Sequence, residues 1–432
     1  MFQALFRKGR LKLSIPTDNL QTVITRHPVP ALGRLEEAVR DAVNNPIGTP
    51  KLTDMAKRGD KVTFLSGPYP YAPVVGPVIL DELNRAGVRD EDVTLVVAVG
   101  THLHSEEGNR KTLGPVMERV GRTVLFDSVK REDLRFVGVT GYGNPTWVSK
   151  YMAESDLNIG IGDITPGLYG LRGGAKIVSP GCAGFETIGY NHRLIMSPTA
   201  KPGDVNNPIN LDMEESARLA QLDMKVDLVH NGGSGPNAGY AGVFAGDFVK
   251  EKRAALSLVK QVFGTKMDEK ADIVVLIDQQ AAAPADYLFD GIYTRLLFAS
   301  LAAKEDGIVI PVISAWGGYS AIEHPGMESH PCSMHEANRL ARLSLEDLAR
   351  TLVRNECNVR CGSLVYPHRR VFEERRTFLV TEGISKEEGE KLGLAYITDS
   401  FDDAFQKALR ERGKDVQIAV HLGEWGAMPL VE

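Results

Sequence analysis

A glycine-rich segment between residues 160 and 194 contains the densest set of side chains that could carry chemistry. Glycines let the backbone approach a ligand closely and leave amide N–H groups able to bind anions. Lys176 follows Gly173 and Gly174 almost directly, within reach of whatever such a loop holds. The segment is not a P-loop, because GxxxxGK[ST] is absent. Its spacing alone therefore leaves two interpretations open, a nucleotide-binding loop and a tight structural turn.

Histidines flank this segment in positions that suit proton transfer or metal binding. His102 ends the run Gly100-Thr101-His102 after an apolar stretch, with His104 close behind it, and His192 lies near the end of the glycine-rich segment. An imidazole takes and returns protons near neutral pH, and a strand end is where a sheet presents reactive groups. Taken singly, each histidine could equally be structural, and Lys176 could be a solvated charge.

Several of these runs resemble, in order along the chain, the motifs of the nickel-dependent lactate racemase (LarA-like) family. Motifs that recur in the right order are far more specific than any one alone. The chain is therefore identified as a divergent member of that family. The matching runs are Gly100-Thr101-His102, Gly173-Gly174-Ala175-Lys176, Pro180-Gly181, the ETIxxNH run from Glu186 to His192, and GVFAGD from Gly242 to Asp247.

The resemblance implies a cofactor and a set of site residues. The family's nickel-pincer nucleotide, a pyridinium bisthiocarboxylate mononucleotide carrying nickel, would be joined covalently to Lys176, with Arg172, Gly173 and Gly174 beside it. His192 would be the protein's nickel ligand. A lysine must be neutral to form an amide-type bond, which burial favours, and imidazole is a suitable nickel ligand. By the same resemblance, His102 removes the proton of the substrate hydroxyl while hydride leaves the adjacent carbon.

The residues that handle substrate depart from the family pattern. Tyr69 stands where the family has an arginine that grips the substrate carboxylate, and Tyr169 lies in a stretch that lacks the family's second catalytic histidine. The Gln and Lys expected at the start of the second domain are also missing, although Arg295 could supply charge from a shifted register. Arg172 replaces a small residue and could take over the carboxylate clamp, because a guanidinium binds carboxylates in bidentate fashion.

These departures keep the cofactor anchor and change the substrate chemistry. We predict an isomerase that racemises or epimerises a 2-hydroxy acid other than lactate by reversible hydride transfer. His104 is preferred as the second base, with Tyr169 and Asp163 as alternatives, because a phenol is a poor base at neutral pH. Two other classes stay open: a non-catalytic or sensory paralogue, and a different nucleotide-dependent redox enzyme or lyase on the same scaffold.

The elements that would position these residues form an α/β pattern. Apolar runs at 61–66, 93–100, 123–128 and 157–163 alternate with a helical pattern at 75–86 and a second helix around Met117 and Val120. Such alternation predicts a mostly parallel sheet, in which the loops 66–73, 101–107 and 164–176 lie on one rim.

A second α/β region follows. A charged segment at 266–270 precedes new predicted strands at 271–278 and 307–314, with helices at 293–304, 334–343 and 345–354. We predict two α/β domains with mostly parallel sheets and a cleft between them: an N-terminal cofactor-anchoring domain over 1–268 and a C-terminal domain over 269–418. The tail 419–432 is predicted to return to the first domain.

Composition narrows the class of partners. The chain has 432 residues, enough for two cores, with 43% hydrophobic and 25% charged residues and a formal charge of −6, so no nucleic-acid partner is expected. The N-terminus lacks a signal-peptide pattern and no apolar stretch is long enough for a membrane span, which predicts a cytoplasmic protein without membrane association. Its expected partners are a small 2-hydroxy acid and the enzymes that make the cofactor.

One independent metal site is conceivable in the second half. Histidines and cysteines cluster there, although their spacing does not match a standard zinc finger, and buried cysteines often act as small apolar residues. The residues concerned are His324, His330, Cys332, His335, Cys357, Cys361 and His368.

Overall fold

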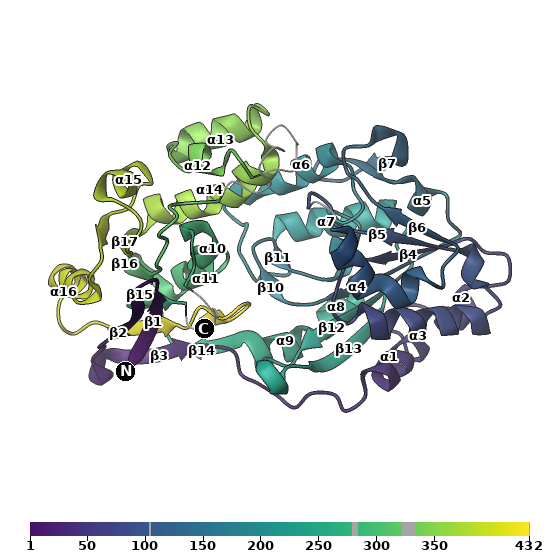
Figure 1. Cartoon of the computed structure of the whole chain (residues 1–432), viewed down its shortest axis with the longest axis horizontal. Coiled ribbons are helices and arrows are strands. Elements are labelled where there is room, and N and C mark those ends of the chain that lie inside the picture. The colour runs from purple at the N-terminus through teal and green to yellow at the C-terminus, as the bar shows by residue number, and fades with distance from the viewer. Residues whose placement is uncertain (103–104, 279–283, 322–333, 432) are drawn as a thin grey trace. The chain divides into compact units, whose positions relative to one another are not determined.

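The computed structural model describes residues 1–102, 105–278, 284–321 and 334–431, and it divides into two compact units (Figure 1). We call residues 28–165 and 169–262 the N-terminal unit. Residues 1–27, 166–168 and 263–432 make up the C-terminal unit. Each unit is built around its own six-stranded sheet.

The sheet of the N-terminal unit is parallel except at one edge. The only antiparallel pairing within it joins β12 and β13. Its central strands are continuous apolar runs because helices cover them; every residue of β4 is buried. In sheet order the strands are β13 (Tyr240–Gly246), β12 (Met224–His230), β9 (Leu157–Asp163), β4 (Val62–Ser66), β5 (Val93–Val97) and β6 (Arg122–Leu125).

Helices and short strands complete this unit. Val75, Ile79 and Leu83 repeat at helical spacing on α3 and are buried in the same apolar core as Phe64 of β4. The helices are α1 (Leu35–Asn44), α2 (Leu52–Met55), α3 (Ala72–Arg85), α4 (Glu106–Met117), α5 (Lys150–Ala153), α6 (Phe185–Arg193), α7 (Pro208–Leu219), α8 (Lys250–Ala254) and α9 (Leu256–Phe263). The hairpin of β7 (Leu134–Val139) and β8 (Pro145–Ser149) and the short strand β11 (Gly170–Leu171) also belong to this unit, whereas the short strand β10 (Pro166–Gly167) belongs to the C-terminal unit.

The predicted fold class is confirmed, and the predicted rim exists. The strands β9, β4 and β5 are neighbours and run parallel, so their carboxyl ends lie along one edge. The loops that follow these three strands are the ones that carry Asp163 to Lys176, Tyr69, and His102. The topology thereby brings together chain segments that lie up to about a hundred residues apart, as parallel sheets do.

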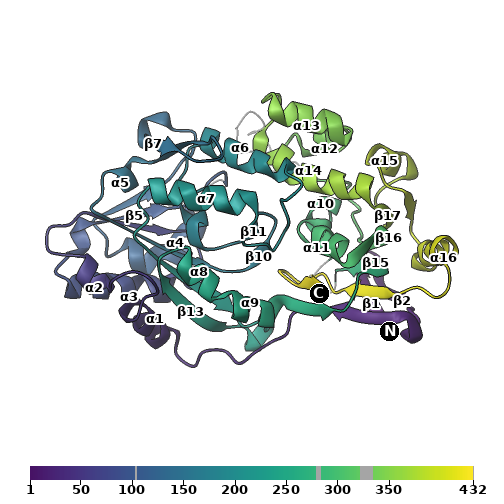
Figure 2. The ribbon, with the colours of Figure 1, turned by 180° about the vertical axis from the view of Figure 1, so that it is seen from behind.

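The C-terminal unit contains a fully parallel sheet (Figure 2). In sheet order its strands are β18 (Tyr396–Thr398), β17 (Arg376–Val380), β16 (Ala303–Val312), β15 (Ala271–Ile277), β19 (Ile418–His421) and β3 (Leu20–Ile24). Two further pairs are β1 (Phe2–Phe6) with β2 (Gly9–Leu13) and β14 (Gly264–Met267) with β20 (Met428–Val431). The helices are α10 (Leu288–Ile292), α11 (Arg295–Ala302), α12 (Ala337–Leu340), α13 (Leu345–Val353), α14 (Val359–Glu374), α15 (Lys386–Lys391) and α16 (Phe401–Arg412).

The chain ends are placed differently from the prediction. The strand β3 pairs with β19, and Ala4, Phe6 and Leu13 are buried in the core of the C-terminal unit, so the first 27 residues belong there and not to the N-terminal unit. The tail also stays in the C-terminal unit, because β19 pairs with β15 and β20 pairs with β14. Local hydrophobic patterns identified the strands but carry no information about which sheet receives them.

Local signals at the helix ends were more informative. Ser344 caps α13, accepting a hydrogen bond from the backbone amide of Asp347 at 3.1 Å. None of the helices in the described part of the chain combines the length and apolar character needed to cross a membrane.

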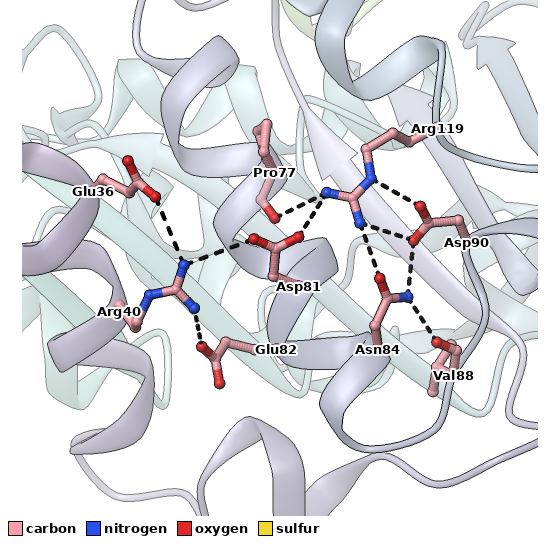
Figure 3. Close-up of polar contacts among 9 residues, drawn as sticks. All are labelled: Glu36, Arg40, Pro77, Asp81, Glu82, Asn84, Val88, Asp90 and Arg119. Atoms are coloured by element: carbon pink, nitrogen blue, oxygen red, sulfur yellow. Dashed lines mark hydrogen bonds and ion pairs between the residues drawn. The ribbon is translucent and has the colours of Figure 1, made fainter.

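A network of ion pairs connects helices of the N-terminal unit (Figure 3). Arg119 donates from Nε to Asp90 Oδ2 and from Nη1 to Asp81 Oδ1, both at 2.8 Å. Arg40 of α1 donates to Glu82 at 2.7 Å and lies 3.7 Å from Asp81. Because Asp81 and Glu82 belong to α3, this network joins α1, α3 and the segment after α4 around one helix.

Candidate functional site at the sheet rim

Lys176 lies on a single helical turn where three of the sequence motifs meet. The turn is the 3-10 helix Gly174–Ile177, and the carbonyl of Lys176 accepts a hydrogen bond from the amide of Gly181 at 3.2 Å. The carbonyl of Gly181 in turn accepts from the amide of Gly100 at 3.0 Å. A Cβ on Gly100 would stand 3.0 Å from the carbonyl oxygen of Pro180, so glycine allows this close approach. The motifs that carry His102 and Lys176 are therefore bonded through Gly181.

The Lys176 amine is partly buried and weakly basic for a lysine. Desolvation by burial, reinforced by the positive charges of Arg172 and Lys252, lowers its pKa to about 7, although Asp163 acts in the opposite direction. About half of the lysines at this position would then be uncharged at neutral pH. A neutral amine is the form that can attack an acyl group, so Lys176 is suited to form a covalent bond.

A buried ion cluster supports the glycine loop that precedes Lys176. Asp227 and Lys225 are fully buried on β12 and form an ion pair, and Asp227 also accepts a hydrogen bond from the amide of Gly174. The loop residue Gly173 has φ of 82°, and a Cβ there would lie 2.8 Å from Asp227 Oδ2. Much of the glycine content thus serves packing against this cluster. The prediction that Gly173 and Gly174 contact a cofactor stays a prediction.

The helix α8 contributes two more buried charged residues. Lys252 is 0% exposed and donates from Nζ to the carbonyl of Leu171 at 2.9 Å and to Asn210 Oδ1. Burial, together with the neighbouring Asp227, raises the pKa of Glu251 well above its ordinary value. The buried surroundings of Glu251 therefore favour its protonated form.

The cluster depends on glycines in the strand beside it, which yields a stability prediction. A Cβ on Gly162 of β9 would stand 2.5 Å from Lys225 Nζ and 2.6 Å from Asp227 Oδ1. A buried ion pair cannot move into solvent to make room, so we expect Gly162→Ala to lower the free energy of unfolding by about 3 kcal/mol. Denaturant unfolding of the purified variant measures this change.

Gly114 provides the matched control. It lies in α4, and a Cβ there would meet nothing within 4 Å. Gly114→Ala should therefore raise the free energy of unfolding by about 0.5–1 kcal/mol through helix propensity alone. Equal unfolding midpoints for Gly162→Ala and the parent chain would contradict this prediction, since they would show that the Lys225–Asp227 ion pair can accommodate a methyl group at position 162.

An aromatic group stands at the end of β4, where the family arginine was expected. Tyr69 and Tyr71 stack with ring centroids 5.1 Å apart, and Tyr240 packs edge-on against Tyr71 at 5.5 Å. Burial and the charge of Asp163 raise the pKa of Tyr69, and they raise the pKa of Tyr240 to about 12. All these phenols are thus neutral at physiological pH. Tyr69 does not replace the charge of an arginine.

Arg172 is the residue predicted to replace the family arginine that is missing at position 69. Its backbone amide donates to the carbonyl of Thr165 at 2.9 Å, and its side chain is partly buried. Its charge opposes the rise in the pKa of Tyr69 and lowers the pKa of Lys176, which places the guanidinium near both groups. Tyr69, Arg172 and Lys176 therefore lie near one another, and their roles in one site stay a prediction.

His192 occupies the last turn of α6 in a defined hydrogen-bonding environment. It is 5% exposed, its Nδ1 lies 3.0 Å from Asn191 Oδ1, and its ring packs against Tyr169 with centroids 4.3 Å apart. The Asn191 amide nitrogen donates to the carbonyl of Ile209 at 2.9 Å and to Asp212 Oδ2 at 2.8 Å. The oxygen of Asn191 must then be the acceptor, so Nδ1 of His192 carries the proton and Nε2 carries the lone pair.

The other predicted site residues lie in separate surroundings. His102 has an exposed side chain at the start of its loop, and His104 lies outside the described residues. Arg295 belongs to the C-terminal unit, where it donates to the carbonyls of Asp290 and Gly291 and lies 3.7 Å from Asp278 Oδ2. The roles of His102, His104 and Arg295 stay predictions.

The independent metal site in the second half gains no support from the residues that can be described. In the described ranges, no group of three or more His, Cys, Asp or Glu side chains could hold a metal ion. His368 is a buried core residue whose Nε2 lies 2.8 Å from the carbonyl of Tyr293, and Cys361 packs against Met334 at 3.7 Å. His324, His330 and Cys332 lie outside the described residues.

Two features were missed or misassigned from the sequence. The sequence did not indicate the buried ion cluster, because charged residues are normally exposed on the surface. Its members are Lys225, Asp227, Glu251 and Lys252. The run Met-Lys-Val-Asp-Leu-Val inside a buried strand was the available clue. Asp247, the end of the GVFAGD motif, caps α8 by accepting from the amides of Val249 and Lys250, a structural role.

The sheet, the rim and the lysine turn define an α/β protein with a reactive amine beside a glycine loop. Residues 6–203 match the family described as the lactate racemase N-terminal domain. The lactate racemase of Thermoanaerobacterium thermosaccharolyticum is 26% identical over 316 residues, covering 71% of this chain and 72% of that protein. The lactate racemase of Lactiplantibacillus plantarum is 28% identical over 295 residues, covering 66% and 67%. These comparisons support assignment of the chain as a divergent member of the lactate racemase (LarA-like) family.

Solved structures share the fold over nearly the whole length. The lactate racemase apoprotein from Thermoanaerobacterium thermosaccharolyticum superposes with a TM-score of 0.78 at 21% identity, covering 100% of this chain and 99% of that one. A protein from Thermotoga maritima superposes with a TM-score of 0.61 at 16% identity, covering 94% and 100%. At these identities the similarity establishes the two-unit α/β architecture.

Proposed function

We propose that the protein is a racemase or epimerase of a 2-hydroxy acid other than lactate, using a nickel-pincer nucleotide joined to Lys176. The observation that carries this proposal is the Lys176 amine, which is partly buried, has a pKa lowered to about 7, and occupies the lysine position of the family motif. His192 supports it from the other side. With Nδ1 protonated toward Asn191, His192 is prepared to offer Nε2 to a metal.

The chain's residues would divide the chemistry between them. When bound, such a cofactor supplies reversible acceptance of a hydride from carbon 2 of the substrate. His102 would accept the hydroxyl proton of the substrate while carbon 2 is oxidised, and would return that proton to the same oxygen when carbon 2 is reduced again. Reduction from the other face of carbon 2 would invert its configuration without net oxidation. The second proton acceptor would be His104, Tyr169 or Asp163, and Arg172 would hold the substrate carboxylate.

The substitution at position 69 supports a substrate other than lactate. Lactate offers a methyl group and a carboxylate, and the family grips the carboxylate with the arginine that Tyr69 replaces. Here a neutral aromatic group of Tyr69, Tyr71 and Tyr240 stands at that place. Aromatic faces would favour an apolar or ring-bearing substituent in place of the methyl group of lactate, while Arg172 would hold the carboxylate.

A second candidate is a non-catalytic paralogue that binds cofactor or hydroxy acid without turnover. The observation favouring it is Tyr169, which stands in place of a histidine base and packs against His192. A neutral phenol cannot accept a proton at physiological pH unless its pKa falls, so one face of the substrate could lack a base.

The proposal is tested by producing the full chain together with cofactor-making enzymes and nickel. We expect the intact mass to rise by the mass of the covalent nucleotide, and peptide mapping to place it on Lys176. An unmodified chain, under conditions that load a lactate racemase made in parallel, contradicts the cofactor assignment.

Turnover is then measured on the loaded protein. Chiral analysis over a panel of 2-hydroxy acids with small, aliphatic, aromatic and polyhydroxy substituents should identify at least one substrate, and deuterium placed on carbon 2 should be retained in the inverted product, because a hydride does not exchange with water. Silence across the panel from fully loaded protein contradicts the racemase assignment and supports the non-catalytic candidate.

A further inference from the structure

Lys252 is a fully buried lysine to which the proposed reaction gives no role. It lies on α8, five residues after Asp247, which caps that helix, and is 0% exposed. Burying an ammonium group is unfavourable unless it is well paired, so its presence requires a compensating role. Its contacts point toward the glycine loop.

The lysine reaches the loop at its first residue. Lys252 Nζ donates to the carbonyl of Leu171 at 2.9 Å and to the side-chain oxygen of Asn210. A Cβ on Gly174 would lie 2.8 Å from Lys252 Cδ, so the aliphatic part of the side chain lies against the turn that carries Lys176. At the other end of the loop, Asp227 accepts from the Gly174 amide. Both ends of the segment 171–174 are thus held from buried charged side chains.

We propose that Lys252 is a positioning residue for Lys176: it fixes the start of the glycine loop and holds a buried positive charge beside the turn that carries Lys176. This inference rests on the proposed function for the importance of Lys176 but not for its test. Lys252 touches neither substrate nor cofactor, and it acts through the loop and through its charge.

Electrostatics agree with this geometry. The charged groups that face Lys176 are Arg172 from the loop, Lys252 from α8 and Asp163 from the end of β9. The two cations lower the pKa of Lys176 and the carboxylate raises it. Burial lowers the pKa of Lys252 itself to about 8, with Glu214 and Asp227 opposing the change, so Lys252 is mostly charged at pH 7. Removing that charge must raise the pKa of Lys176 and leave a larger fraction of it protonated.

The test is the pH dependence of Lys176 labelling in the apoprotein, with a small amine-specific acetylating reagent and peptide mass analysis. We compare the parent chain with Lys252→Gln, which keeps a donor for Leu171 but loses the charge. The pH of half-maximal labelling should move upward, and labelling at pH 7 should fall about threefold to tenfold. Labelling is measured below the unfolding temperature of each variant, because an unfolded chain would also shift the midpoint upward toward the ordinary lysine pKa.

Two further variants keep the outcome decisive. Lys250→Gln alters an exposed lysine on the same helix and should reproduce the parent profile. Lys252→Arg keeps the charge and should restore the midpoint even if it lowers the unfolding temperature. Thermal unfolding is recorded for each, and if Lys252→Gln is unfolded, the midpoint of Lys252→Arg decides. A folded Lys252→Gln variant with the labelling midpoint of the parent chain would overturn the proposal. A labelling midpoint of Lys252→Arg that departs from that of the parent chain would overturn it too.

This experiment is independent of the cofactor. If the parent chain never acquires a nucleotide, the proposed function fails while the labelling shift can still be observed. If the nucleotide is acquired but the midpoint is insensitive to Lys252, only the positioning role fails.

Discussion

A Lys176→Met variant produced with the cofactor-making enzymes is expected to retain the mass of the unmodified chain, with nucleotide and turnover both below detection. Methionine has a similar length and apolar stem but no amine, and the covalent bond needs a nucleophilic nitrogen. Because the pKa of Lys176 is lowered to about 7, the parent chain has the neutral amine available at physiological pH. Intact-mass measurement, followed by chiral assay, checks both parts.

The exposed lysine of α8 serves as the control, since Lys250→Met should load normally. A nucleotide adduct on Lys176→Met would mean that another residue is the anchor. Lys260 is a second exposed lysine for comparison, in the next helix.

The Lys176→Met variant should also change the pH dependence of the free energy of unfolding, in a definite direction. In the unfolded chain a lysine keeps its proton to about pH 10.4, whereas folded Lys176 releases it near pH 7. Between these values the unfolded state binds more protons, so the stability of the apoprotein rises as pH rises from 7 to 10. Lys176→Met should be more stable than the parent at pH 7 and should lose this part of the pH dependence. Thermal unfolding across that range measures it.

The parts of the fold that could be predicted from the sequence are those that local composition determines. The strands β4, β9 and β15 were located to within a residue or two because each is a continuous apolar run bounded by turns, and covered parallel strands require that composition. The placement of β3 failed for the complementary reason. Its pairing partner β19 lies almost four hundred residues later in the chain, and no local pattern encodes that contact.

The candidate site divides in the same way. Lys176 and His192 were found because a run of motifs in fixed order identifies a family even where each motif is weak. The ion cluster of Lys225, Asp227 and Lys252 was not, since a charged residue is expected on a surface unless tertiary contacts pair it. Gly162 illustrates both cases. The sequence placed it correctly in a strand, but only the structure explains why it is glycine, because the Lys225–Asp227 ion pair occupies the space where a Cβ would stand.

His192→Ala is expected to separate cofactor attachment from metal binding. The nucleotide should still form on Lys176, because that reaction uses a different residue, whereas nickel bound per adduct-bearing chain should fall by about tenfold or more. Intact mass gives the first quantity and elemental analysis the second. Tyr190→Ala, which removes an exposed ring two residues earlier on α6, should leave nickel unchanged.

The hydrogen-bond chain behind His192 makes a graded version of this test possible. Asn191 is bound to Asp212 and to the carbonyl of Ile209 through its nitrogen, which leaves its oxygen to hold the Nδ1 proton of His192. Asn191→Leu keeps the volume but removes that acceptor, so the tautomer and orientation of the imidazole are no longer fixed. Nickel affinity should weaken by about 10–100-fold, less than the loss in His192→Ala. Equal nickel content in the parent chain, Asn191→Leu and His192→Ala would show that the metal is held elsewhere, and nickel loss in Asn191→Leu without any in His192→Ala would exclude the imidazole as the ligand.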